Sequence, residues 1–194
     1  GTRQPHFPIV LVDSYVYPSA SPGVWRLDPV SLDTTLITSG GQLVQPDRVA
    51  VDRSGIIHVA DRVSGVVSID PNTGAQSVLL SPSALGGRTA RGICLAGDST
   101  LAITTVGSNS GAVLSVNPRT REVGVVSQGG LLENPACVTL GPDGALYVGD
   151  LSASSAPGTS GSIVRVDASG GQNLFANGGP FRGPFDIAIS SHVA

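Results

Sequence analysis

The stretch that decides the fold reads Pro46-Asp-Arg-Val-Ala-Val-Asp-Arg-Ser-Gly-Ile-Ile-His-Val-Ala-Asp61. Related stretches begin at Ala90 and Pro135, and a shorter one, Pro184-Phe-Asp-Ile-Ala-Ile-Ser190, lies near the end of the chain. The four copies start at residues 46, 90, 135 and 184, so their starts are 44, 45 and 49 residues apart. A period in this range is typical of proteins in which each repeat is one structural unit.

The copy that starts at Pro46 predicts four short strands. Its apolar runs are rich in Val, Ile and Leu, and each ends at Gly, Pro, Asp or Ser, as strands do before turns. No long stretch repeats apolar residues at the helical spacing i, i+3, i+4, i+7. The predicted strands are Val49–Asp52, Ile56–Ala60, Val66–Asp70 and Gln76–Leu80. Four short antiparallel strands in a unit of about 40–50 residues predict one blade of a β-propeller.

The two ends of the chain predict one divided blade. The first unit has candidates for the second, third and fourth strands only, at Ile9–Asp13, Val24–Asp28 and Thr35–Thr38. Residues 184–190 have the pattern of a first strand, and nothing in the chain continues it as a blade. We therefore expect the C-terminal strand to complete the N-terminal blade, which also removes open sheet edges.

The sequence thus predicts an all-β chain that forms a single propeller domain over residues 1–194. Its four blades of four antiparallel strands are expected at 9–40 plus 184–190, 46–81, 90–128 and 135–176. Two alternatives stay open at this point. Two chains could exchange end strands to form an eight-bladed ring, or the chain could be a piece of a longer propeller.

Composition argues against several classes of protein. The net charge is −3, so there is no basic surface to attract nucleic acid. No apolar run approaches the roughly 18 residues that a membrane span needs, so we expect no membrane span. The chain has no Met, and we therefore expect a processed N-terminus, as in an extracellular or periplasmic bacterial protein.

The stretch from Pro46 to Asp61, followed by Gly65-Val-Val-Ser-Ile-Asp-Pro-Asn-Thr-Gly74, resembles the NHL-repeat and gluconolactonase-like superfamily of β-propellers. The resemblance covers nearly the whole chain and implies the propeller fold. It implies little about activity, because such propellers include lactonases, lyases, esterases and interaction scaffolds.

The resemblance also directs attention to the position after the first Pro of each repeat. Calcium-dependent hydrolases of this group carry Asn or Asp there in several blades, and the side chains converge on the metal. The corresponding residues here are Asp47, Arg91, Ala136 and Phe185, and Asp186 is one step out of frame. Asp47 is the one possible ligand among the four, so we expect no cofactor, with Ca²⁺ as the alternative.

Other polar residues have structural interpretations. His58 lies in the middle of a predicted strand, where a packed histidine is ordinary. No Ser/His/Asp group for nucleophilic catalysis can be recognised in the sequence. Asp residues that end the second and third strands are expected to accept hydrogen bonds from the backbone of the following loop. Cys94 and Cys137 lie on the first strands of adjacent blades, and unpaired thiols are favoured over a bond between blades.

Strand direction predicts where a ligand would bind. Loops between strands 2 and 3 and between strands 4 and 1 share one face, and these loops are long and variable. We call it the long-loop face, and the opposite one the short-turn face. Variable loops on a rigid scaffold commonly carry function. The candidate ligand-binding residues near the junction of the first and fourth blades are Tyr15, Tyr17, Asp47, Arg48, Arg91, Phe181, Arg182 and Asp186. The alternative is that the aromatic residues, with Phe185, cover the seam between blades.

Three functions remain in competition. The first is a secreted, non-catalytic propeller that binds a protein, a small molecule or a glycan, or serves as a structural subunit. The second is an enzyme of the lactonase or lyase type with its site in the channel. The third is a subunit that forms homo-oligomers by strand exchange.

Overall fold

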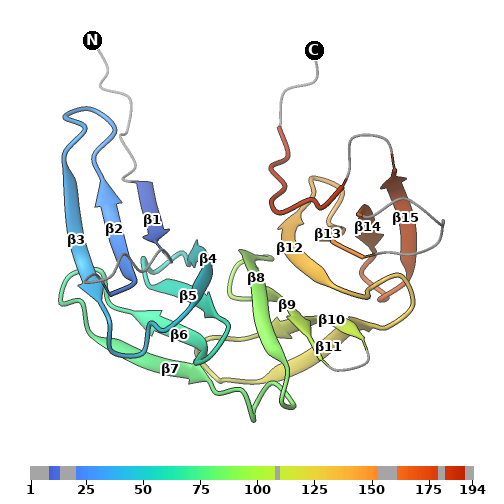
Figure 1. Cartoon of the computed structure of the whole chain (residues 1–194), viewed down its shortest axis with the longest axis horizontal. Coiled ribbons are helices and arrows are strands. Elements are labelled where there is room, and N and C mark those ends of the chain that lie inside the picture. The colour runs from blue at the N-terminus through green and yellow to red at the C-terminus, as the bar shows by residue number, and fades with distance from the viewer. Residues whose placement is uncertain (1–8, 14–20, 108–109, 153–160, 179–181, 191–194) are drawn as a thin grey trace.

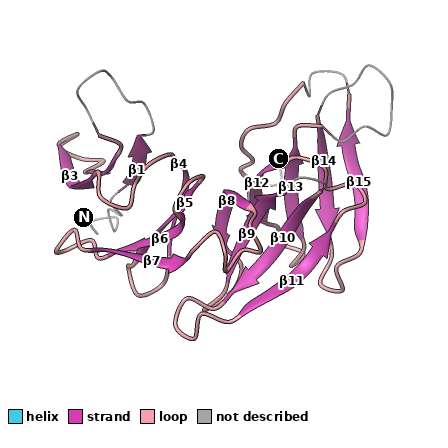
Figure 2. Ribbon diagram, turned by 60° about the horizontal axis from the view of Figure 1, so that its bottom comes forward, coloured by secondary structure: helices cyan, strands magenta, loops and turns pink. Residues whose placement is uncertain are grey.

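The computed structural model describes residues 9–13, 21–107, 110–152, 161–178 and 182–190. All regular elements in these residues are β-strands, joined by loops and turns (Figure 2). The strands are β1 (Ile9–Asp13), β2 (Gly23–Leu27), β3 (Thr34–Ser39), β4 (Pro46–Val51), β5 (Ile57–Asp61), β6 (Gly65–Ile69), β7 (Gln76–Leu80), β8 (Thr89–Leu95), β9 (Leu101–Val106), β10 (Gly111–Val116), β11 (Val123–Gln128), β12 (Pro135–Leu140), β13 (Leu146–Asp150), β14 (Ser162–Val166) and β15 (Gln172–Asn177). The described part of the chain contains no helix long and apolar enough to cross a membrane.

These strands form four antiparallel sheets, which are the four blades of a propeller. The sheets are β1–β3, β4–β7, β8–β11 and β12–β15, and each strand pairs with its neighbours in chain order. Figure 1 shows the sheets side by side around an arc, with the first and fourth blades at its ends. The prediction of an all-β propeller with four blades is confirmed, because the short apolar runs between turn residues become the strands of these sheets.

The end of the chain differs from the prediction. The first sheet has three strands, and residues 182–190 form no strand in the structure. The segment instead contacts other blades: the Pro184 carbonyl accepts a hydrogen bond from the Cys137 thiol on β12, and the Phe185 carbonyl accepts one from Arg48 on β4. These side-chain contacts hold the segment near the centre of the arc, so it does not complete the first blade.

The innermost strands of the last three blades pack closely. Strand β8 lies between β4 and β12. Gly92 on β8 donates its N–H to Thr104 Oγ1 at 2.7 Å, and a Cβ at Gly92 would lie only 2.8 Å from Cys137 Cα on β12. This approach requires glycine, because any larger residue would push β8 away from its neighbours.

Each seam between blades buries an apolar cluster. Successive side chains of a strand point to opposite faces of the sheet, so a central blade contributes to two seams. In β5, Ile57 and Val59 pack towards the first blade, whereas Ala60 packs towards the third. A third cluster, which includes Val113 and Val148, fills the seam between the third and fourth blades. The hydrophobic core is therefore divided among the seams.

Buried Asp residues hold the loops that follow the second strands. The carboxylate of Asp61 accepts hydrogen bonds of 2.8–2.9 Å from four backbone N–H groups, at residues 44, 45, 63 and 64. Asp150 binds the backbone N–H groups of residues 133, 134 and 152 in the same way. Asp70 similarly accepts N–H bonds from the turn after the third strand. The structural interpretation of these Asp residues is confirmed.

The two cysteines are free thiols on neighbouring inner strands, as favoured from the sequence. Burial raises the pKa of the Cys94 thiol to about 12 and that of Cys137 to about 11. Because the thiolate is the reactive form, both residues are expected to be unreactive at neutral pH.

Candidate functional site

Three arginines surround the Asp47 carboxylate at the centre of the arc. Asp47 and Arg48 are the second and third residues of β4, Arg91 lies near the start of β8, and Arg62 follows β5 directly. The Nε atoms of Arg62 and Arg91 each donate to Asp47 Oδ2 at 2.9 Å. Arg48 Nη1 lies 3.4 Å from Asp47 Oδ1 and donates to the Asp47 carbonyl at 2.8 Å. We call Arg48, Arg62 and Arg91 the arginine cluster.

Arg48 also binds the C-terminal segment. Its Nη2 donates to the Phe185 carbonyl, and its guanidinium carbon lies 5.9 Å from the centre of the Phe185 ring. Its Nε is buried and makes no hydrogen bond to a described residue, with Asp186 Oδ1 4.0 Å away. The described residues thus provide no hydrogen-bond acceptor for this buried donor.

The structure brings together four of the eight residues predicted for this site: Asp47, Arg48, Arg91 and Asp186. Arg182 is exposed, while Tyr15, Tyr17 and Phe181 lie outside the described residues. Phe185, which the sequence offered as a seam-covering residue, contacts Arg48.

Sequence reasoning missed Arg62. Its position immediately after the buried Asp61 is the signal that could have found it, because the end of a second strand lies beside the start of a first strand. All members of the cluster therefore lie at strand ends on the long-loop face, where a ligand was predicted.

The arginine cluster does not fit a calcium ion. Calcium needs several oxygen ligands that converge on one point, and both oxygens of Asp47 already lie within 3.4 Å of guanidinium nitrogens. In the described part of the chain, no group of three or more His, Cys, Asp or Glu side chains is placed to hold a metal. Guanidinium groups bind carboxylates and phosphates with paired hydrogen bonds, so the residue types at this site suit an anion better than a cation.

A second polar group, unrecognised from sequence, lies on the short-turn face. The buried His58 has Nδ1 at 2.9 Å from Ser68 Oγ and Nε2 at 3.0 Å from Asp52 Oδ2. Burial alone would raise the pKa of Asp52, but hydrogen bonds from Ser54, His58 and a backbone N–H lower it below its usual range. The three residues come from three adjacent strands or their ends, so only the pairing of β4, β5 and β6 brings them together.

The fourth blade has a corresponding group of different composition. Tyr147 pairs with Arg165 across β13 and β14, just as His58 pairs with Ser68 across β5 and β6. Both Tyr147 and Arg165 bind Asp143, and the Arg165 hydrogen bond lowers the pKa of that carboxyl. In each blade, side chains of the second and third strands bind an Asp near the turn between the first two strands. The residue types differ between the two blades, but both groups hold that turn in place.

No model of a known protein family matches the chain, and no curated protein sequence matches it. Solved structures do resemble it. A chain of the nidogen–laminin complex has a TM-score of 0.71 at 16% identity, and the match covers 88% of this chain and 61% of that chain. TolB from Acinetobacter baumannii has a TM-score of 0.62 at 15% identity, over 88% of this chain and 41% of that chain. For virginiamycin B lyase from Staphylococcus aureus the TM-score is 0.57 at 11% identity, over 79% and 48%.

These likenesses support the propeller fold and nothing narrower. At 11–16% identity they do not distinguish the NHL and gluconolactonase-like group from other propellers. The chain also spans only 61% and 41% of the first two of these neighbours. Their roles include both binding and catalysis, so these likenesses do not indicate one function for this chain.

Proposed function

We propose that this propeller is a non-catalytic binding domain whose arginine cluster recognises an acidic group on a protein or glycan partner. The observation that carries the proposal is the arginine cluster itself: three guanidinium groups surround the single carboxylate of Asp47, and the buried Nε of Arg48 makes no hydrogen bond to a described residue. Leaving a buried donor without a partner costs about 1–3 kcal/mol. A carboxylate from a partner would bind the accessible guanidinium groups of the cluster, because the side chains of Arg62 and Arg48 are 40% and 23% exposed.

Charge supports the same ligand class. Three guanidinium groups lie around one largely buried carboxylate, Asp47, and the exposed Asp186 lies 4.0 Å from one of them. The centre therefore keeps a cationic excess, although the whole chain has a net charge of −3. A local field of opposite sign attracts and orients an acidic partner. The structural neighbour from the complex of nidogen with laminin supports a role in protein binding.

The test compares two matched arginine substitutions. Arg48→Gln removes the guanidinium with the unsatisfied Nε, and Arg26→Gln makes the same charge change at an exposed position of β2. The probes are a fluorescent hexaglutamate peptide and an oligogalacturonate, read by fluorescence anisotropy and by competition. We expect Arg48→Gln to weaken binding about tenfold, as loss of a charge-assisted hydrogen bond implies.

Arg26→Gln should leave both affinities unchanged, and the melting temperatures of the variants show whether the fold is kept. Absence of binding by the unmodified chain to either probe would overturn the proposal. An equal loss in both variants would overturn it as well, since it would reveal nonspecific attraction.

A second function, self-assembly, is favoured by the two end faces of the arc. On the first blade, Leu11, Trp25 and Leu36 are exposed side by side in register. On the fourth blade, Phe175 is exposed where the second blade buries Leu79. In the interior seams such faces cover each other, so we infer that the fourth blade of one copy packs on the first blade of another.

Native mass spectrometry and light scattering test this assembly. The unmodified chain should have the mass of two chains or more, and Leu11→Glu should reduce it to one. Val63→Glu, at an exposed valine in the loop after β5, is the matched control and should keep the higher mass. A single-chain mass for the unmodified protein would rule out self-assembly without affecting the proposal for the arginine cluster.

A further inference from the structure

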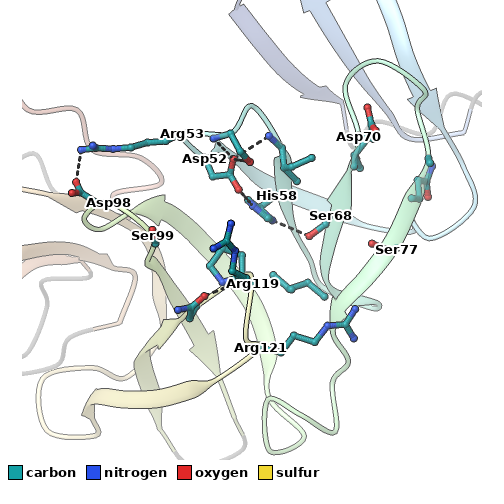
Figure 3. Close-up of a pocket in the computed structure, with 18 residues that line it drawn as sticks. Asp52, Arg53, His58, Ser68, Asp70, Ser77, Asp98, Ser99, Arg119 and Arg121 are labelled. Atoms are coloured by element: carbon teal, nitrogen blue, oxygen red, sulfur yellow. Dashed lines mark hydrogen bonds and ion pairs between the residues drawn. The ribbon is translucent and has the colours of Figure 1, made fainter.

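A pocket of about 800 Å³ lies between the second and third blades on the short-turn face. Figure 3 shows its lining: Asp52, His58 and Ser68 form one side, and Arg119 and Arg121 lie on the opposite side. The apolar residues Ile56 and Leu79 also line it. We call this cavity the seam pocket. It is distinct from the arginine cluster, which lies on the long-loop face.

The next seam provides an internal reference. A pocket of about 200 Å³ occupies the corresponding place between the third and fourth blades. There Ala96 and Ala102 stand in the places of Asp52 and His58, and the next turn contributes Asp167 and Ala168. A seam lined by small side chains at these positions therefore has a smaller pocket. Compared with this reference, the seam between the second and third blades has the larger volume and the charged lining.

Most charges around the seam pocket are already engaged. Arg53 forms an ion pair with Asp98 across the two blades. Asp52 binds His58 and Ser54, and Asp70 accepts backbone N–H bonds from its own turn.

Two arginines of the lining, Arg119 and Arg121, are exposed to solvent. Among the described residues, the guanidinium groups of Arg119 and Arg121 have no ion-pair or hydrogen-bond partner. The pocket therefore has an excess of positive charge on one side and apolar surface beside it.

Arg121 occupies a backbone position that normally favours glycine. Its φ is 63°, and its N–H donates to the carbonyl four residues earlier, at Asn117. The equivalent turn of the second blade has Gly74 there, with φ of 70° and the same bond, and the first blade has Leu32. A side chain in this left-handed conformation is unfavourable, so turn geometry does not account for an arginine at the pocket.

We propose that the seam pocket binds a small organic oxyanion, a carboxylate or a phosphate ester, on the side lined by Arg119 and Arg121. The two guanidinium groups would bind the anionic oxygens, and the apolar side chains beside them would bind the carbon part of the ligand. The Asp52–His58–Ser68 group keeps the opposite wall in place, because both ring nitrogens of His58 are held by hydrogen bonds.

The experiment measures binding of benzoate, phenyl phosphate and inorganic phosphate to the full chain by calorimetry and chemical-shift changes. We expect one of the two aromatic anions to bind, and tighter binding of benzoate or of phenyl phosphate identifies the carboxylate or the phosphate class. Inorganic phosphate should bind more weakly, because it lacks the carbon part. Arg121→Gly and Arg119→Gln should each reduce the affinity about tenfold.

Leu32→Gly is the matched control, since it makes the same backbone change in the first blade. Both glycine variants should keep or raise the melting temperature, so loss of binding in Arg121→Gly alone isolates the guanidinium. The proposal is overturned if neither aromatic anion binds, if Leu32→Gly reduces binding as much, or if inorganic phosphate binds as tightly as the aromatic probes.

Discussion

Strands β5 and β1 occupy the same place in two blades but differ in burial. Every residue of β5 is buried, with Ile57 only 1% exposed. In β1, Ile9 is 45% exposed and Leu11 is 44% exposed, and they alternate with the half-buried Val10 and Val12. Both strands are short and apolar and end in Asp, so their own sequences do not explain the difference.

The neighbours of each strand explain it. Val10 and Val12 pack against the second blade in one apolar cluster with Ile57 and Val59. Ile9 and Leu11 point to the other face of their sheet, which forms one end of the arc (Figure 1). The apolar side chains on one face of a blade therefore stabilise the fold only where another blade covers that face.

Truncating the buried side chain at the start of β5 should destabilise the protein most. Ile57→Ala should lower the free energy of unfolding by about 2–5 kcal/mol, because it removes a fully buried side chain and leaves a cavity. Ile9→Ala, at the equivalent position, should cost about 0.5 kcal/mol or less. Urea unfolding at low protein concentration measures both.

Repeating the measurement at high protein concentration tests whether a second copy covers the exposed face of the first blade. If a second copy covers the first blade, the cost of Ile9→Ala should increase with concentration, whereas that of Ile57→Ala should not. Equal losses of unfolding free energy for the two variants at low concentration would contradict the conclusion that stability depends on coverage by a neighbouring blade.

A smaller effect is expected at the ends of the same strands. Asp61→Ala should cost about 1–3 kcal/mol, because buried N–H groups of two loops lose their acceptor. Asp13→Ala, at the exposed end of β1, is the matched control and should cost less. Thermal unfolding with both variants provides the measurement, and Asp150→Ala should behave like Asp61→Ala. A larger loss for Asp13→Ala would show that burial does not decide the role of these residues.

The repeat pattern was sufficient to predict the strands, the loop-binding Asp residues and part of the central site. Each of these depends on residues of one repeat or on positions that recur in every repeat. Asp47 and Arg91 could be placed together because both follow the start of a repeat, and starts converge at the centre.

Contacts between different repeats could not be predicted from the sequence. Residues 184–190 have the pattern of a first strand, but Arg48 and Cys137 hold the segment elsewhere. The seam pocket combines Asp52 with Arg119, which belong to turns of different blades, and its size depends on how those blades pack. Periodicity along one chain contains no information on such packing.

The smallest expected effect concerns acid stability of the second blade. The pKa of Asp52 is lower in the folded protein than its ordinary 3.8, because hydrogen bonds from Ser54 and His58 outweigh the effect of burial. Ionised Asp52 therefore stabilises the fold above pH 3.8, and this contribution is lost as the pH falls from 3.8 through the folded-state pKa. Asp52→Asn should remove this pH dependence, and Ser54→Ala should remove part of it, in urea unfolding measured at a series of pH values. The same slope below pH 3.8 in all three proteins would show that the group holding the second blade's turn contributes nothing to acid sensitivity.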